Sequence, residues 1–181
     1  MIVLVKIVIL GDPKKDLLNK FFNRIFNENT AFALGLTCCV IDKVVEGTTI
    51  RFQVFSLDTR KILKSKKSDV HELYIHRALG GMVVFDACNP ESYQEIPSWI
   101  DELWKNTAIG KIPIVITSVN GYERNKATAF ITDEEAHLYA KKLREKHGIS
   151  IDYIPVDERT GENIDLVLET LGKIILNSRI S

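Results

Sequence analysis

The stretch Lys6-Ile7-Val8-Ile9-Leu10-Gly11-Asp12 decides the fold, because it is a run of apolar, mostly β-branched residues that stops at a glycine. A continuous apolar run of this length is typical of a strand buried on both faces of a sheet. Three later runs have the same character and are separated by segments with helical spacing: Gly81–Asp86, Pro113–Thr117 and Ile151–Val156. Buried strands that alternate with helices predict a largely parallel sheet covered on both faces, which is an α/β fold.

A hairpin interrupts this alternation. Glu46-Gly47 lies between the strand-like segments Cys38–Val45 and Thr49–Leu57, and such a pair favours a tight turn. We therefore expect a three-layer fold with about six strands, of which one is an antiparallel edge strand, and about five helices. The helices are predicted in the following segments: Asp16–Phe26, Lys66–Leu79, Pro90–Trp104, a segment that begins after the N-cap Thr132 and ends at Lys146, and Glu162–Leu176.

Length and composition narrow the class of protein further. The chain has 181 residues, 24 Lys+Arg against 24 Asp+Glu, and 45% hydrophobic residues, which predicts a single folded domain over residues 1–181 and disfavours a nucleic-acid partner. Cys38, Cys39 and Cys88 have no metal-ligand spacing, so we expect no metal and a reducing, cytoplasmic location. The short apolar runs and the C-terminal sequence predict neither a membrane span nor a lipid anchor.

The segment Lys6–Asp12 resembles the first strand of a Ras/Rab-type small GTPase. Further segments resemble that family in the same order along nearly the whole chain: Gly47–Phe55, Tyr74–Asp86, Asn89–Tyr93, Ile112–Ile116 and Thr160–Ile164. The resemblance implies the P-loop NTPase type of α/β fold, with a guanine-nucleotide site at the carboxyl ends of the strands.

The phosphate loop of that family is degenerate in this chain. A phosphate loop wraps consecutive backbone N–H groups around phosphate, which requires glycine conformations and full length. Here Pro13 has no N–H, and the resemblance requires a deletion of three residues. In an alternative reading, Lys15 replaces the phosphate-binding lysine and Asp16 replaces the Mg²⁺-binding Ser/Thr. The candidate nucleotide-binding residues of this alternative are Gly11, Asp12, Lys14, Lys15, Asp16, Asn120 and Glu123.

The other nucleotide motifs implied by the resemblance are also altered. The first-switch Thr is Ala33, and the D-x-x-G motif is Ser56-Leu57-Asp58-Thr59, followed by Arg60 where the family positions the attacking water. The N-K-x-D motif falls on Val119-Asn120-Gly121-Tyr122, or, with a slip of one residue, on Asn120-Gly121-Tyr122-Glu123. The S-A-K motif is Asp157-Glu158-Arg159, which would place negative charge opposite a guanine carbonyl.

These losses predict a pseudo-GTPase without catalytic residues or a cofactor, which acts as a protein-interaction or scaffold module. Two alternatives stay open: weak binding of GTP or GDP with Mg²⁺, and an enzyme of other chemistry on the same fold. We expect the partner to be another protein or a second copy of the chain, bound at a surface that corresponds to the family's switches. The residues of this surface are Cys38, Val40 and Asp42 on the edge strand and Arg60, Lys64, Lys66 and Lys67 in the basic run Arg60–Lys67.

Overall fold

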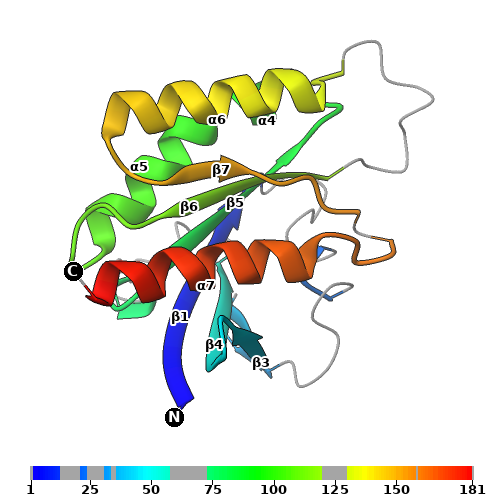
Figure 1. Cartoon of the computed structure of the whole chain (residues 1–181). Helices are drawn as coiled ribbons and strands as arrows, with labels where there is room; N and C mark the ends of the chain where they lie inside the picture. Colours follow the sequence, from blue (N-terminus) through cyan, green and yellow to red (C-terminus); the bar gives the residue numbers. More distant parts are fainter. Residues whose placement is uncertain are drawn as a thin grey trace.

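The computed structural model describes residues 2–12, 21–23, 31–33, 36–57, 73–119, 130–157 and 159–180. Within them the chain forms one sheet of seven strands in the order β2-β3-β4-β1-β5-β6-β7 (Figure 1). The strands are β1 (Ile2–Gly11), β2 (Ala31–Ala33), β3 (Leu36–Val45), β4 (Thr48–Leu57), β5 (Gly80–Asp86), β6 (Ile114–Val119) and β7 (Ile151–Tyr153).

The sheet is mixed, as the sequence predicts. Pairings β1–β4, β1–β5, β5–β6 and β6–β7 are parallel, whereas β3 pairs with β4 in the antiparallel hairpin. Glu46 and Gly47 form the hairpin turn with φ values of 49° and 77°, a region that glycine adopts without strain. The strand β2 was not predicted, because three residues with the sequence Ala-Phe-Ala carry no recognisable strand pattern.

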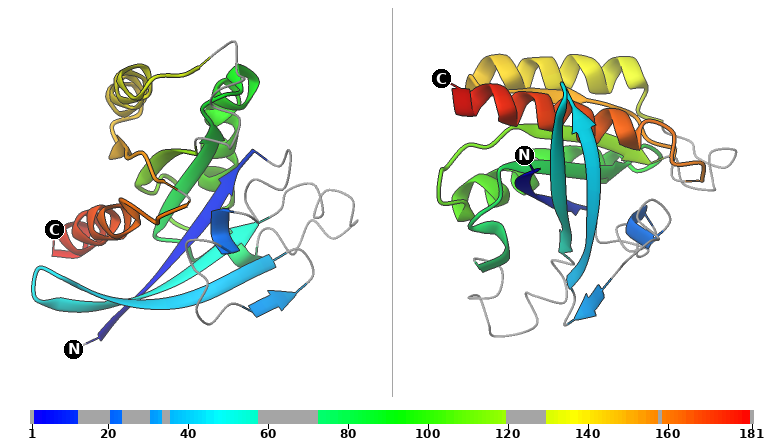
Figure 2. Two further views of the ribbon diagram at one scale, coloured as in Figure 1. Left: turned by 90° about the vertical axis from the view of Figure 1, so that its right-hand side faces the viewer. Right: turned by 60° about the horizontal axis from the view of Figure 1, so that its bottom comes forward.

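Helices cover both faces of this sheet. They are α4 (Pro90–Gln94), α5 (Ile96–Asn106), α6 (Asp133–His147) and α7 (Ile164–Ile180). In Figures 1 and 2, α7 lies on one face of the sheet and α5 on the other. Two apolar clusters correspond to these faces, since Val8 and Leu10 pack with residues of α5 and α6, whereas Ile7 and Ile9 pack with residues of α7. The alternation along β1 explains why this strand reads as continuously apolar.

Some boundaries differ from the predicted ones for physical reasons. The predicted helix Pro90–Trp104 is divided at Glu95, because Pro97 cannot donate a helical hydrogen bond and its ring would clash with the preceding turn. The strand predicted over Ile151–Val156 ends at Tyr153. The final helix begins and ends later than predicted, at Ile164 and Ile180. Of the predicted helix Asp16–Phe26 only residues 21–23 are described, and they are helical. Of the predicted helix Lys66–Leu79 the structure describes residues 73–79, in which the helix ends at Ile75, so the prediction extends it four residues too far.

The α6 boundaries follow the sequence signals closely. The Thr132 side chain accepts a hydrogen bond from the backbone N–H of Glu135 at 3.2 Å, and the Glu135 carboxylate accepts one from the backbone N–H of Thr132 at 2.8 Å. At the other end, Gly148 adopts a left-handed conformation and closes the helix. None of the helices in the described part of the chain is long and apolar enough to cross a membrane.

Candidate functional site

The carboxyl ends of the parallel strands form the edge where an α/β fold of this type holds its ligand. Strand β1 reaches this edge at Gly11, β5 at Asp86 and β6 at Val119. The loop that begins at Asp157 follows β7 toward the same edge. The structure describes these four points, and the resemblance assigns Gly11, Val119 and Asp157 among them to the nucleotide site.

Gly11 is required by the packing of β1 against β5. A Cβ atom at this position would lie 2.0 Å from the backbone oxygen of Val84, so no larger residue fits without moving the strand. The next residue, Asp12, continues the pairing, because its backbone N–H donates to Val84 at 3.1 Å. The Asp12 side chain is 3% exposed and accepts a hydrogen bond from Asn89 Nδ2 at 3.4 Å. The other predicted phosphate-site residues, Lys14, Lys15 and Asp16, lie outside the described residues.

Ser56 occupies the place that the resemblance assigns to a metal-orienting carboxylate. It lies on β4 in register with Ile9 of β1 and Thr37 of β3, and it is 3% exposed. A buried hydroxyl carries no charge, so it cannot supply the electrostatic attraction that an aspartate gives to Mg²⁺. Within the part of the chain that the structure describes, no group of three or more His, Cys, Asp or Glu side chains is arranged to hold a metal ion.

Val119 occupies the first position of the guanine-reading motif in one of the two alignments. Its side chain is 1% exposed and belongs to the apolar cluster beneath α7, together with Ile154 and Val156. Its backbone oxygen accepts a hydrogen bond from Ala87 at 3.1 Å, which ties β6 to the end of β5. This position therefore serves the core. The residues of the slipped alignment, Asn120 and Glu123, lie outside the described residues.

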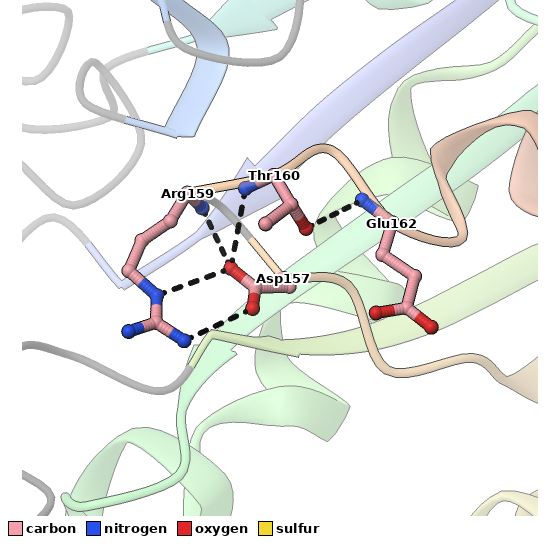
Figure 3. Close-up of polar contacts among 4 residues, drawn as sticks. All are labelled: Asp157, Arg159, Thr160 and Glu162. Atoms are coloured by element: carbon pink, nitrogen blue, oxygen red, sulfur yellow. Dashed lines mark hydrogen bonds and ion pairs between the residues drawn. The ribbon is translucent and has the colours of Figure 1, made fainter.

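The loop after β7 is closed by its own carboxylate (Figure 3). Asp157 Oδ1 accepts hydrogen bonds from the backbone N–H groups of Arg159 at 2.8 Å and Thr160 at 3.4 Å. The Arg159 guanidinium donates to Oδ2 of the same carboxylate at 3.1 Å. The Arg159 side-chain and backbone hydrogen bonds hold the pKa of Asp157 below its ordinary value of 3.8, so this carboxylate is ionised at neutral pH.

A second polar element links β6, β7 and α6 and was missed by the sequence reasoning. The Tyr153 hydroxyl donates to Asp133 Oδ1 at 2.6 Å, and its oxygen lies 2.6 Å from Ser118 Oγ, which must then be the donor. Ser118 is 1% exposed and Tyr153 is 4% exposed, whereas Asp133 is exposed, so the chain of hydrogen bonds joins β6, β7 and α6 and runs from the interior to the surface. No local sequence motif predicts that these residues interact, because they are far apart in the sequence.

The predicted partner surface is described only on its hairpin side. Strand β2 pairs with Leu36–Cys38, which corrects the expectation that the whole segment Cys38–Val45 forms the sheet edge. Val40 and Asp42 lie on the part of β3 beyond β2, and both are exposed. Arg60, Lys64, Lys66 and Lys67 lie outside the described residues.

The hairpin that carries this surface is fixed to α7. Lys43 forms an ion pair with Asp165. A Cβ atom at Gly172 would lie 2.9 Å from Ile50 Cδ1 and 3.1 Å from Val45 Cγ2, so the helix approaches the hairpin closely. Figure 2 shows the hairpin turn extending beneath α7.

Comparison with known proteins agrees with this architecture. The model of the Ras family matches residues 6–177, and the chain therefore belongs to the Ras family. It is 26% identical over 171 residues to the Ras-related protein Rab-11A of Dictyostelium discoideum, an alignment that covers 93% of this chain and 74% of that protein. It is 23% identical to the Ras-related protein RABA2a of Arabidopsis thaliana over 93% of this chain and 73% of that protein. It is 25% identical to the GTP-binding protein YPT53 of Saccharomyces cerevisiae over 93% of this chain and 75% of that protein.

Proposed function

We propose that this Ras-family chain is a pseudo-GTPase: a single domain that neither binds guanine nucleotide tightly nor hydrolyses GTP, and that acts as a protein-interaction module. The free thiols of Cys38 and Cys39 support a reducing compartment, and a cytoplasmic location is part of the proposal.

The observation that carries the proposal is the closed loop of Asp157 and Arg159. In the family this segment faces the guanine carbonyl, which needs a hydrogen-bond donor. Here an ionised carboxylate occupies the segment, and its oxygens already accept hydrogen bonds from Arg159 and Thr160. The oxygen of a guanine carbonyl carries partial negative charge, so the ionised carboxylate of Asp157 would repel it and disfavour binding.

Two further positions support the same conclusion independently. Ser56 replaces a carboxylate that would orient Mg²⁺, and Val119 places an apolar core side chain where one alignment puts a guanine-reading amide. A charge-assisted hydrogen bond contributes about 1.5–3 kcal/mol, and about 1.4 kcal/mol corresponds to a tenfold change in affinity. The loss of about five such contacts therefore weakens binding by roughly a millionfold, with allowance for non-additivity.

A direct test is the nucleotide content of the purified protein. A tightly bound guanine nucleotide survives purification, so the absorbance at 260 nm relative to 280 nm and chromatography of the denatured protein both report it. We expect a protein-like absorbance ratio and no released nucleotide. Stoichiometric GDP or GTP in the preparation would contradict the proposal and would support the alternative site at Lys14, Lys15, Asn120 and Glu123.

The interaction surface in the proposal is the outer part of β3 together with the basic run Arg60–Lys67. The ion pair of Lys43 with Asp165 and the close approach of Gly172 to the hairpin both attach the hairpin to α7. They support a hairpin that keeps a single conformation whether or not nucleotide is bound. The basic run would add salt-sensitive charge steering toward a partner.

Charge reversal tests this surface. Lys64→Glu, Lys66→Glu and Lys67→Glu in one variant should reduce capture of partner protein from native lysate, and about 0.5 M salt should do the same for the parent chain. A matched control reverses Lys141, Lys142 and Lys146, which are exposed on α6 at the far side of the sheet. Capture that is unchanged by the first variant and by salt would exclude the basic run from the interface.

A further inference from the structure

Four exposed apolar side chains gather on one face of the sheet. Exposed fractions are 57% for Ile2, 53% for Leu4, 47% for Val40 and 71% for Val44. They belong to β1 and β3, on either side of β4, although they are far apart in the sequence. Soluble proteins expose single apolar side chains routinely, but a contiguous group of them is typical of an interaction site.

The strand register shows that these side chains share a face. Val44 is in register with Thr49, and Thr49 with Ile2. One row further along, Asp42 is in register with Arg51, and Arg51 with Leu4. Residues in register on neighbouring strands point to the same side of a sheet. We call the group Ile2, Leu4, Val40, Asp42, Val44 and Arg51 the open face.

The opposite side of the same strands is covered by α7. Val45, Ile50 and Phe52 belong to the apolar cluster that includes Leu171 and Ile175 of this helix. Figure 2 shows α7 on that side of the hairpin. Toward the ligand edge, the open face ends at Lys6, whose ammonium group lies 4.8 Å from the centre of the Phe55 ring and 5.9 Å from that of Tyr74.

The charges at the centre of the open face are balanced. The Arg51 guanidinium donates to both carboxylate oxygens of Asp42, at 2.8 Å and 2.7 Å. An apolar patch with one acidic and one basic group at its middle can pair with a second copy of itself, because in a twofold arrangement Asp42 of one copy can lie opposite Arg51 of the other, each carboxylate then being shared between two guanidinium groups. The formal net charge of zero for the whole chain leaves little long-range repulsion between copies.

From this arrangement we propose that the open face binds a second copy of this chain, so that the protein forms a twofold symmetric dimer. The proposal names a partner for the hairpin side of the surface described under the proposed function, but it does not depend on the loss of nucleotide binding. Strand spacing of about 4.8 Å over three strands and a rise of about 3.3 Å per residue give the open face dimensions of roughly 10 Å across the strands and roughly 13 Å along them. This is small beside the ~800 Å² that each partner buries in a standard interface, so the dimer is weak and exchanges rapidly.

Sedimentation velocity of the full chain over a concentration series tests the proposal. We expect monomer at about 5 µM and a substantial dimer fraction at about 500 µM, in keeping with the small interface. Leu4→Lys combined with Val44→Lys should weaken the dimer at least about tenfold, since each lysine would have to be desolvated. The control is Leu138→Lys on α6, because Leu138 is 54% exposed and lies far from the open face.

A charge-exchange experiment then tests the twofold arrangement. Asp42→Arg and Arg51→Asp are each expected to remain monomeric, because either change places like charges opposite one another. A mixture of the two variants should form a heterodimer at least as tight as the parent dimer. Thermal unfolding of each variant establishes that it is folded.

Three results of these experiments would overturn the proposal, and a fourth, from lipid vesicles, would do the same. The first three are a parent chain that stays monomeric at the highest concentration, a dimer that the lysine variant does not weaken, and a mixture that shows no gain over its components. Vesicles of neutral lipid that bind the parent chain while the chain itself stays monomeric would assign the open face to a membrane and would equally contradict a dimer. None of these results bears on the nucleotide content of the protein, so failure of this proposal is distinguishable from failure of the proposed function.

Discussion

At the scale of single residues, three described positions that the resemblance assigns to the nucleotide site have structural contacts of their own. Gly11 matches a glycine of the family's phosphate loop. In this structure the absence of a side chain at Gly11 allows β1 to approach the backbone of Val84 closely. Val119 lies in the core, and Asp157 closes its own loop. A residue that packs in the core or closes a loop contributes to the free energy of folding whether or not a ligand is bound.

Gly11→Ala tests the packing role. Because the added Cβ would lie 2.0 Å from the Val84 oxygen, β1 must move, and we expect the free energy of unfolding to fall by about 2–4 kcal/mol. Gly47→Ala is the control, since nothing lies within 4 Å of its added Cβ and its φ of +77° costs only about 1 kcal/mol. Urea denaturation measures both, and equal losses would show that the Gly11 contact is not rigid.

The pH response of Asp157 is a second prediction at this scale. Arg159 lowers the pKa of Asp157 below its ordinary value of 3.8, so the interaction stabilises the fold above that pH and is lost as the pH falls through the lowered pKa. Arg159→Ala should raise the pKa of Asp157 toward 3.8, as followed by NMR of the carboxyl carbon. Asp42 is the internal control, because its own lowered pKa depends on Arg51 and should not change. An unaltered titration of Asp157 would mean that the ion pair does not form in solution.

At the scale of elements, the strands and the α6 helix were predictable because their signals are local. Burial on both faces makes the parallel strands read as unbroken apolar runs, and Thr132, Glu135 and Gly148 mark the ends of α6. The division between α4 and α5 is also local in origin, since Pro97 causes it. The strand β2 was not predictable, because its three residues pair with β3 through the tertiary fold.

The hydrogen-bonded chain of Ser118, Tyr153 and Asp133 connects three elements and can be tested as a unit. Tyr153→Phe removes the central hydroxyl and leaves Asp133 and Ser118 without this partner, so we expect a loss of about 1–3 kcal/mol in the free energy of unfolding. Ser118→Ala in the Tyr153→Phe background should cost less than in the parent chain, because the shared hydrogen bond is already absent. Additive losses in this double-mutant cycle would show that the two groups do not interact.

At the scale of the whole molecule, the sequence predicts the architecture better than the site. The order of strands and helices and the match of the Ras family over residues 6–177 agree with the predicted fold. The sequence assigns Val40 and Asp42 of the open face to a partner surface, but Ile2 and Leu4 could not be predicted as part of it, because they become neighbours of β3 only through the strand register. The roles of Val119 and Asp157 likewise depend on tertiary packing and loop geometry that a motif does not contain.

The most direct test of the central claim is titration of the full chain with a fluorescent guanine nucleotide in the presence of Mg²⁺. The account predicts no saturable binding at micromolar concentrations for the parent chain. Asp157→Ser combined with Ser56→Asp, which returns two positions to the family pattern, is the matched variant and should bind guanine nucleotide more tightly than the parent. Saturable binding of the parent chain with a dissociation constant below about 10 µM, which corresponds to roughly 7 kcal/mol, would contradict the account.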